Sequence, residues 1–293
     1  MKPNLAETPD GSPLTWPKYA SPKLDGIRAI VKDGRLLSRS LKLIPNEAIR
    51  DLLAKTTALD GELICGSPTA PDVYNKTYRK VMTINGDTEG VVFYVFDLQN
   101  LSLPYASRLS DLVRATESSI SNVKVLPQTL LHSQEELEAY YQQVLEMGYE
   151  GAILRNPNAM YKLGRSTAVS QDMLKMKPLE DSEATVIECY EAMENQNKVF
   201  TNELGRSDRS TDAAGLVPKN MVGGFVARVL TGKFAGKVTN IAPGKLVHKE
   251  RSEIWANKGS YEGKVLTFRH MPHGAMDAPR HARFYRWKLD SNI

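Results

Sequence analysis

The chain is poor in the features that would place it outside the cell or in a membrane. It contains two cysteines among 293 residues, Cys65 and Cys189, too few for a disulfide framework and without the spacing of metal ligands. No apolar run approaches the roughly 20 residues that cross a bilayer, and residues 1–13 lack the apolar centre of a secretory signal. The five histidines are scattered, which argues against a zinc site. We therefore expect a protein of a reducing cytoplasm without a transmembrane helix.

The composition is that of a globular protein, with 41% hydrophobic and 25% charged residues, which excludes a disordered chain. The length suits one large domain or two smaller ones. The net charge of +4 is unevenly spread, because residues 1–181 carry 21 basic and 22 acidic residues and residues 182–293 carry 17 and 12. A basic segment beside a neutral one indicates a polyanionic partner that touches mainly the C-terminal part, and a solvated surface face is the alternative.

Strand-like and helix-like segments alternate in the first half of the chain. An Asp-Gly turn after residues 26–31 predicts a hairpin. Ser133 and Glu136 predict a capping box at the start of a helix, and Gly148 has the position of the glycine that follows a helix. The elements expected from these patterns are strands at 26–31, 36–40, 59–65, 91–98 and 152–155, and helices at 45–55 and 134–147.

The pattern changes after residue 178, where short strand candidates follow one another and only residues 246–255 have helical spacing. Five or so strands with one helix in about 110 residues predict a small β-barrel of the OB type. A polar stretch at 194–222 is expected to be a long basic loop, because it contains Lys198, Arg206, Arg209 and Lys219. We place the domain boundary near 178–182, which gives domains 1–181 and 182–293. The strand candidates are 184–190, 224–230, 236–241 and 264–269.

A short motif, Lys23-Leu24-Asp25-Gly26, precedes the first hairpin. By itself it is weak, because about one chain in fifteen of this length would carry it by chance, and a surface lysine ahead of a strand is the alternative. Its weight comes from further motifs that follow in a fixed order. These are LDGEL at 59–63, FYVFDL at 93–98, YEGAILR at 149–155 and LKMK at 174–177.

This ordered set resembles the covalent nucleotidyltransferase motifs of ATP-dependent DNA ligases, which are relatives of RNA ligases and mRNA capping enzymes. The run PRHARFYR at 279–286 resembles the last ligase motif, so that the resemblance spans residues 20–288. It implies an α+β fold, in which an adenylation domain with antiparallel sheets and helices precedes a C-terminal OB-fold β-barrel.

The resemblance identifies Lys23 as the nucleophile that bonds to the α-phosphate of ATP and releases pyrophosphate. An amine at its ordinary pKa is protonated and inert at neutral pH, so partial burial or nearby cations must lower that pKa. Lys175 and Lys177 are implied to flank the α-phosphate together with Mg²⁺, for which Mn²⁺ is an expected substitute, and to stabilise the charge that develops.

Other positions of the motifs are implied to hold the nucleotide. Glu62 contacts the ribose or a metal ion, and Glu150 helps to hold the divalent ion. Phe96 stacks on the adenine, with Phe93 as the second candidate, and Ser21 touches the edge of the base. The alternatives are strand-end carboxylates paired with surface lysines, and phenylalanines that belong to the core.

Three arginines are implied to bind phosphate groups, which suits the planar guanidinium. Arg28 and Arg39 correspond to contacts with the phosphates of the nucleotide or of the nick, although an exposed arginine is the alternative for Arg39. Arg280 is expected to orient the leaving pyrophosphate when the OB domain closes over ATP. Arg286 and Lys288 follow where the spacing of this motif varies, and the sequence does not tell which of them acts beside Arg280.

The preferred substrate is nicked duplex DNA, which fits the OB prediction and the basic C-terminal part. The family runs three steps: adenylation of the enzyme, transfer of AMP to a 5′-phosphate, and attack by a 3′-hydroxyl that expels AMP. Only residues 1–22 precede the nucleophile, so we expect the two domains and the 194–222 loop to grip the DNA. The small size resembles phage and bacterial accessory ligases, which predicts a monomer active in DNA replication, repair or recombination in a bacterial or host-cell cytoplasm.

Three other functions are compatible with parts of this pattern. A GTP-using capping enzyme shares the lysine motif, but usually pairs the last arginine with Asp-Lys, which is absent here. An RNA ligase shares the first step and usually lacks this OB domain. A non-enzymatic alternative is a nucleic-acid-binding OB protein with a degenerate nucleotidyltransferase half. It would not be expected to keep the residues Lys23, Glu62, Glu150, Lys175 and Lys177 intact.

Overall fold

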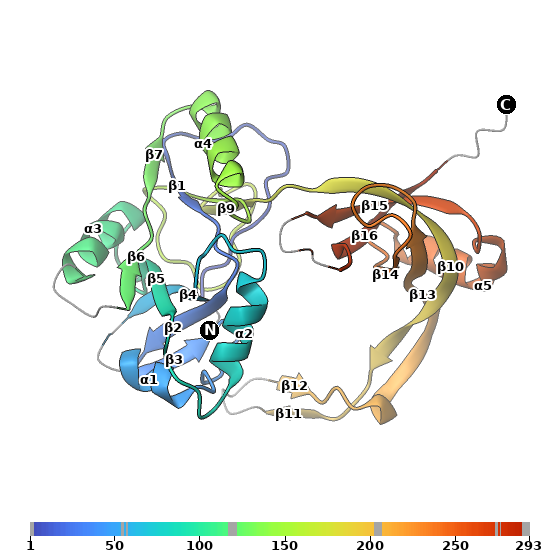
Figure 1. The fold of residues 1–293 in the computed structure, drawn as a ribbon, viewed down its shortest axis with the longest axis horizontal. Helices are drawn as coiled ribbons and strands as arrows, with labels where there is room; N and C mark the ends of the chain where they lie inside the picture. Colours follow the sequence, from blue (N-terminus) through green and yellow to red (C-terminus); the bar gives the residue numbers. More distant parts are fainter. Residues whose placement is uncertain are drawn as a thin grey trace. The chain divides into compact units, whose positions relative to one another are not determined.

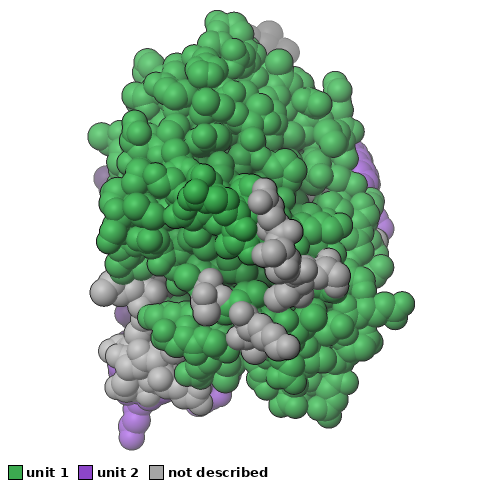
Figure 2. Space-filling model, turned by 90° about the vertical axis from the view of Figure 1, so that its left-hand side faces the viewer, with its two compact units in different colours: residues 1–177 green, residues 178–293 purple. Residues whose placement is uncertain are grey.

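The computed structural model describes residues 3–53, 56, 58–116, 122–201, 207–272, 275 and 277–288. The chain divides into two compact units, Met1–Lys177 and Pro178–Ile293 (Figure 1 and Figure 2), each with its own hydrophobic core. Over the ranges that the structure describes, no helix is long and apolar enough to cross a membrane.

The first sheet of the first unit has five strands in the order β3-β2-β4-β5-β6. All neighbours are antiparallel except β5 and β6. The predicted strands 59–65 and 91–98 are confirmed with the same bounds, because both are short, apolar and rich in residues that favour strands. The strands are β2 (Ile27–Lys32), β3 (Arg35–Ser38), β4 (Leu59–Cys65), β5 (Val91–Leu98) and β6 (Val123–Val125).

Three helices accompany this sheet: α1 (Glu47–Leu53), α2 (Val73–Met82) and α3 (Tyr105–Thr116). The predicted helix 45–55 corresponds to α1, whereas α2 and α3 were not predicted. In α3 the buried positions are Tyr105, Arg108 and Leu112. A charged residue on the buried face interrupts the apolar period on which helix prediction depends.

The second sheet of the first unit is antiparallel, in the order β7-β1-β8-β9. Helix α4 (Gln134–Glu146) begins where predicted, since the backbone N–H of Glu136 donates to Ser133 Oγ at 3.3 Å. The capping box is incomplete, because the Glu136 carboxylate accepts from the N–H of His132 instead of that of Ser133. The strands are β1 (Lys18–Pro22), β7 (Thr129–Leu131), β8 (Ala152–Arg155) and β9 (Met173–Met176).

The second unit contains a five-stranded sheet in the order β14-β13-β10-β15-β16, with antiparallel neighbours. Its two edges meet at a bridge between Ala242 and Arg283, where the Ala242 N–H donates to Ala282 O at 3.0 Å. The sheet therefore closes on itself, and Ile254 of α5 (His248–Ala256) joins its core. The strands are β10 (Glu180–Asn195), β13 (Leu216–Val229), β14 (Val238–Ile241), β15 (Val265–Met271) and β16 (Arg280–Trp287).

The expectation of a long unstructured loop at 194–222 is wrong for its described residues. Strands β10 and β13 remain paired as far as Asn195 and Leu216, and β11 (Val199–Thr201) pairs with β12 (Ser207–Arg209) beyond them. The result is a two-stranded ribbon that extends from the closed sheet (Figure 1). The polar composition of this segment did not indicate strands. Strands can nevertheless form there, because the hydrogen bonds between paired backbones need no apolar side chains.

A buried carboxylate connects the two sheets of the first unit. Asp97 on β5 is fully buried and accepts from Arg108 on α3, with N···O distances of 2.7 and 3.2 Å, and from Nη1 of Arg155 on β8 at 2.7 Å. Arg108 Nη1 also donates to the carbonyls of Leu103 and Ala159 at 2.6 and 3.0 Å. Three elements that lie far apart in the sequence are thereby fixed to one another by charge-assisted hydrogen bonds.

We predict that Asp97→Ala lowers the free energy of unfolding by about 3–5 kcal/mol, because it leaves Arg108 and Arg155 as uncompensated buried cations. Urea unfolding followed by circular dichroism measures the change. The matched control is Asp111→Ala, which removes the partner of Arg114 from an exposed ion pair and should change stability by less than about 0.5 kcal/mol. Equal effects of the two substitutions would contradict the prediction.

Candidate active site

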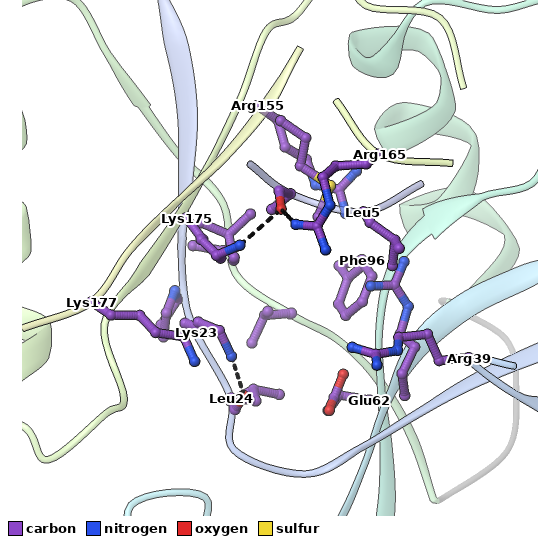
Figure 3. Close-up of a pocket in the computed structure, with 17 residues that line it drawn as sticks. Leu5, Lys23, Leu24, Arg39, Glu62, Phe96, Arg155, Arg165, Lys175 and Lys177 are labelled. Carbon is purple, nitrogen blue, oxygen red and sulfur yellow. Dashed lines mark hydrogen bonds between the residues drawn. The ribbon is translucent and has the colours of Figure 1, made fainter. Parts of the chain in front are cut away.

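Both sheets of the first unit contribute side chains to one pocket. In Figure 3 the three lysines Lys23, Lys175 and Lys177 lie on one side of the pocket, with Phe96 and Arg39 on the other. The structure thus brings together positions that are more than 150 residues apart in the sequence. The predicted site residues that line the pocket are Ser21, Lys23, Arg28, Arg39, Glu62, Phe96, Lys175 and Lys177.

Close backbone contacts explain two glycines of the motifs. At Gly151 a Cβ atom would lie 2.1 Å from the carbonyl oxygen of Met176, and φ is +150°. At Gly26 it would lie 2.3 Å from the carbonyl oxygen of Leu63. Only glycine allows backbones to approach this closely. Gly151 also accepts a backbone hydrogen bond from Lys23 at 2.8 Å, so that the two motifs are fixed against each other.

Glu150 lies between two of the pocket lysines. Its carboxylate is almost fully buried, and one oxygen pairs with the Lys23 amine while the other pairs with the Lys177 amine. Burial, followed by the Lys23 charge, lowers the pKa of Lys177, against the opposing effect of Glu150. The carboxylate therefore holds the predicted nucleophile and a second amine at one place in the pocket.

Leu5 and Ala6, in the segment 4–7, line the pocket, which the sequence did not predict. Leu5 bridges to Arg165 and Glu7 bridges to Leu174 on β9. The Ala6 carbonyl accepts from Lys175 Nζ at 3.1 Å and from Arg165 Nη1 at 3.0 Å (Figure 3). Burial and the Arg165 charge lower the pKa of Lys175. No local pattern marks these residues, because they act through their backbone.

Glu62 on β4 faces the same pocket from the other sheet. Burial raises its pKa to about 7, and the charges of Glu150 and Asp25 act in the same direction, against the opposing charges of Lys23 and Arg28. At neutral pH this side chain therefore exchanges between a carboxylic acid, which donates a hydrogen bond, and a carboxylate, which only accepts. A ribose hydroxyl can pair with either form.

Phe96 forms part of the pocket wall between guanidinium groups. The Cζ atoms of Arg28 and Arg155 lie 4.6 and 5.2 Å from the centre of its ring, within the range of cation–π attraction. Arg28 also binds the buried Asp60 through Nε and Nη2, at 2.6 and 2.7 Å. Its predicted contact with phosphate stays a prediction. The second aromatic candidate, Phe93, does not line the pocket, because it lies in the core on the other face of β5.

The other predicted residues belong to the second unit. Arg280 is on β16 of the second unit, and Lys198, Arg209 and Lys219 are on the ribbon. Arg209 donates to the carbonyl of Asn197 within the ribbon. Arg206 lies outside the residues that the structure describes.

Two solved structures show which fold this is. A structure from a structure–function analysis of Lig E DNA ligases is 24% identical and aligns over 98% of this chain and 99% of that chain, with a TM-score of 0.75. The DNA ligase–adenylate of Chlorella virus is 28% identical over 99% of both chains, with a TM-score of 0.54. The fold is therefore the nucleotidyltransferase-type ligase fold, of the α+β class.

The particular family follows from residues 15–177, which match the family model of the ATP dependent DNA ligase domain. More than half of the chain is matched, so the chain belongs to this family, and the resemblance predicted from the ordered motifs is confirmed. DNA ligase 2 of Methanosarcina mazei is 29% identical over an alignment of 192 residues, and the match covers 56% of this chain and 33% of the relative.

The DNA ligase of Haemophilus influenzae is 29% identical over 171 residues, which are 57% of this chain and 60% of that ligase. The matched region thus spans between about a third and three fifths of the length of these two curated relatives.

We predict that Gly151→Ala lowers the free energy of unfolding by about 1–3 kcal/mol, because the new Cβ atom forces β8 away from the backbone at Met176 and Lys177. Thermal unfolding followed by circular dichroism checks this. Gly259→Ala is the control, since a Cβ atom there meets nothing within 4 Å. A variant as stable as the wild type would show that the strands separate at no cost.

Proposed function

We propose that the protein is an ATP-dependent DNA ligase that seals nicks between a 5′-phosphate and a 3′-hydroxyl in duplex DNA, through a lysyl-AMP intermediate and a DNA-adenylate. The observation that carries the proposal is the convergence of three lysine side chains on one pocket that also contains Glu62 and Phe96. Membership in the ATP-dependent DNA ligase domain family supports the same conclusion. The overall reaction releases AMP and pyrophosphate.

In the first step the Lys23 amine forms an N–P bond with the α-phosphate of ATP, the bond from that phosphorus to the pyrophosphate oxygen breaks, and pyrophosphate leaves. The ammonium form must first lose a proton, because its nitrogen otherwise has no lone pair. Lys175 and Lys177 then stand where cations stabilise the developing negative charge. Their positions are fixed beforehand by Ala6 O and Glu150, so that little reorganisation is needed.

The rest of the pocket would hold the nucleotide. The Phe96 ring would stack on the adenine, and Glu62 would contact the ribose. Ser21, near the C-terminal end of β1, would touch the edge of the base. Arg39 lies in an exposed turn after β3, where it could reach phosphates of the nucleotide or of the nick. Arg280 remains the candidate for orienting the pyrophosphate.

Two carboxylates, Glu62 in the pocket lining and Glu150 paired with Lys23 and Lys177, fit a magnesium ion that binds together with the nucleotide. Magnesium is usually held by one or two carboxylates, with substrate phosphates and water completing its shell. In the part of the chain that the structure describes, no three His, Cys, Asp or Glu side chains gather as a metal site. Glu62 and Glu150 would hold the ion, which would neutralise phosphate charge when bound.

The second unit has the properties expected of a DNA-binding OB-fold. Its sheet of five strands closes on itself, as in OB-fold barrels. Residues 182–293 also carry the net positive charge of the chain. The ribbon adds the exposed cations Lys198 and Lys219, which suit contacts with the phosphate backbone without sequence preference. The DNA complex is proposed to contain one copy of the protein.

The second and third steps would reuse the same pocket. AMP is transferred from Lys23 to the 5′-phosphate of the nick, and the 3′-hydroxyl then attacks that phosphate and expels AMP. The second step breaks the bond between the Lys23 nitrogen and the AMP phosphorus as a phosphate oxygen bonds to it, and the third replaces AMP by the 3′-hydroxyl oxygen. Both steps require positioning and charge stabilisation more than new functional groups.

We predict that Lys23→Ala abolishes both labelling of the protein by ATP and sealing of a 5′-phosphorylated nicked duplex, because no other side chain replaces the nucleophile. A denaturing gel of the labelled protein and of the DNA strands measures both. A matched nicked RNA duplex and GTP serve as controls for the RNA ligase and capping alternatives. Sealing by Lys23→Ala at the wild-type rate would refute the proposed mechanism.

We predict that the double variant Lys198→Gln, Lys219→Gln weakens binding to nicked DNA and reduces the slope of log K against log salt by about 2, since each phosphate contact contributes roughly 0.9. Fluorescence anisotropy at several salt concentrations measures the slope. Labelling of the protein by ATP should not change.

The charge-matched control is Lys32→Gln, Lys249→Gln, which removes two exposed cations outside the ribbon. An unchanged slope in the ribbon variant, or an equal decrease in the control, would exclude direct phosphate contacts of the ribbon.

A further inference from the structure

The segment 4–7 is a part of the pocket that lies outside all the ligase motifs. The first motif begins at Lys23, whereas Leu5 and Ala6 already line the pocket. Asn4, the next residue toward the N-terminus, is 2% exposed. Dashed lines in Figure 3 mark two hydrogen bonds by which pocket side chains reach this segment. A segment so placed can influence the chemistry of the pocket although no motif includes it.

The odd-numbered residues of the segment pair with the backbone of residues 164–175. The Leu5 N–H donates to Gly164 O at 2.9 Å, and the Glu7 N–H donates to Met173 O at 3.0 Å. The carbonyls of the same two residues accept from backbone N–H groups of that stretch, each at 2.8 Å. These four hydrogen bonds fix the segment as a short extended strand along β9 and the residues before it.

The even-numbered residues present their carbonyls to charged side chains that line the pocket. Asn4 O accepts from Arg28 Nη2 at 3.3 Å. Ala6 O accepts from Lys175 Nζ at 3.1 Å and from Arg165 Nη1 at 3.0 Å. Successive residues of an extended strand direct their backbone groups to opposite edges. One edge therefore holds the segment in place, and the carbonyls of the other edge hold three cations of the pocket.

The Ala6 carbonyl keeps two like charges at one place. Lys175 and Arg165 both donate to this one oxygen, although their charges repel each other and a lysine side chain has many rotamers. The charge-assisted hydrogen bonds offset the repulsion and restrict the amine. Satisfaction of the carbonyl does not explain this choice of donors, because a backbone N–H or a water molecule would serve equally. A phosphate that enters the pocket would meet both cations already in position.

We propose that the segment 4–7 is a positioning element for the transfer of AMP to Lys23, and that it acts by holding Lys175 through the Ala6 carbonyl. This inference rests on the proposed function, in which Lys175 stabilises the charge that develops at the α-phosphate. The segment takes no part in making or breaking bonds. Its contribution is that the amine already has its place when the bond to pyrophosphate breaks, so that less reorganisation is needed.

The test releases the segment from β9 without changing any pocket cation. Leu5→Pro, Glu7→Pro removes both N–H groups that donate to residues 164–175, because proline has none. The matched control is Leu5→Ala, Glu7→Ala, which loses the same two side chains but keeps both donors. Formation of the protein–AMP bond is measured with the full chain and ATP, in the absence of DNA, to give kcat and KM separately.

We expect kcat of the proline variant to be about 10- to 100-fold below that of the alanine variant, which is the effect of losing one hydrogen bond to a charged group. The KM for ATP should differ by less than about threefold between the two variants, because Lys175 acts on charge that develops only in the transition state. Release of a wall that merely shaped the nucleotide site would raise KM instead.

A second measurement follows the Lys175 amine directly and needs no ATP. The rate at which an acetylating reagent modifies it is determined by mass spectrometry, with Lys177 of the same chain as the internal reference. Lys177 pairs with Glu150 and makes no printed contact with the segment 4–7. In the proline variant we expect acetylation of Lys175 to be about threefold or more faster than in the alanine variant, with an unchanged rate at Lys177. General loosening of the pocket would accelerate both.

The inference is overturned if kcat of the proline variant stays within about threefold of the alanine variant. It is equally overturned if Lys175 is acetylated no faster, or if both lysines are accelerated alike. Circular dichroism checks that each variant is folded, and Glu7→Pro against Glu7→Ala is the milder pair if the double proline variant does not fold. A wild type that forms no protein–AMP bond with ATP refutes the proposed function, whereas the acetylation rates still test how Lys175 is held.

Discussion

The buried carboxylate of Asp97 is the interaction on which the architecture of the first unit depends. Asp97 belongs to β5, and its carboxylate accepts hydrogen bonds from Arg108 on α3 and from Arg155 on β8. These buried ion pairs join the two sheets. Breaking one partner of such a network is costly, because the remaining charges stay buried. Residues of both sheets line the pocket. Its shape therefore depends on the pairing of Asp97 with Arg155, which holds one sheet against the other.

Within that frame the pocket gathers positive charge around one carboxylate. Glu150 pairs with Lys23 and Lys177, and the Ala6 carbonyl receives Lys175 and Arg165. So many cations would repel one another without these acceptors, and a polyphosphate is the ligand that would gain most from them. Under the proposed function these acceptors would hold the cations in place before a nucleotide binds, which is the usual physical basis of catalysis by charge stabilisation.

The second unit contains two unusually long strands. Strands β10 and β13 contain 16 and 14 residues, against a common length of about 5–6. Their first parts belong to the closed sheet, and their continuation forms the ribbon with β11 and β12. A ribbon of this kind presents cations on a backbone that is already paired, so less conformational entropy is lost on binding than for an unstructured loop.

The sequence alone determined the family and most of the candidate site. The order of the short motifs can be read along the sequence, and these motifs contain Lys23, Glu62, Lys175 and Lys177. Apolar strands such as 59–65 can be predicted from composition. On β5 the resemblance ranked Phe96 before Phe93. Residues three apart on a strand face opposite sides, and only the packing decides which side is the core.

Tertiary structure alone decided what depends on contacts between distant residues. Helix α3 could not be predicted from apolar periodicity, because the charged Arg108 occupies one of its buried positions. This burial is possible only because Asp97 on another element pairs with the arginine. Residues 4–7 act through backbone carbonyls, which every residue has, and the ribbon is held by backbone pairing between polar strands. Local patterns report residue type and period, whereas the satisfaction of a buried charge or carbonyl is fixed only when the chain has folded.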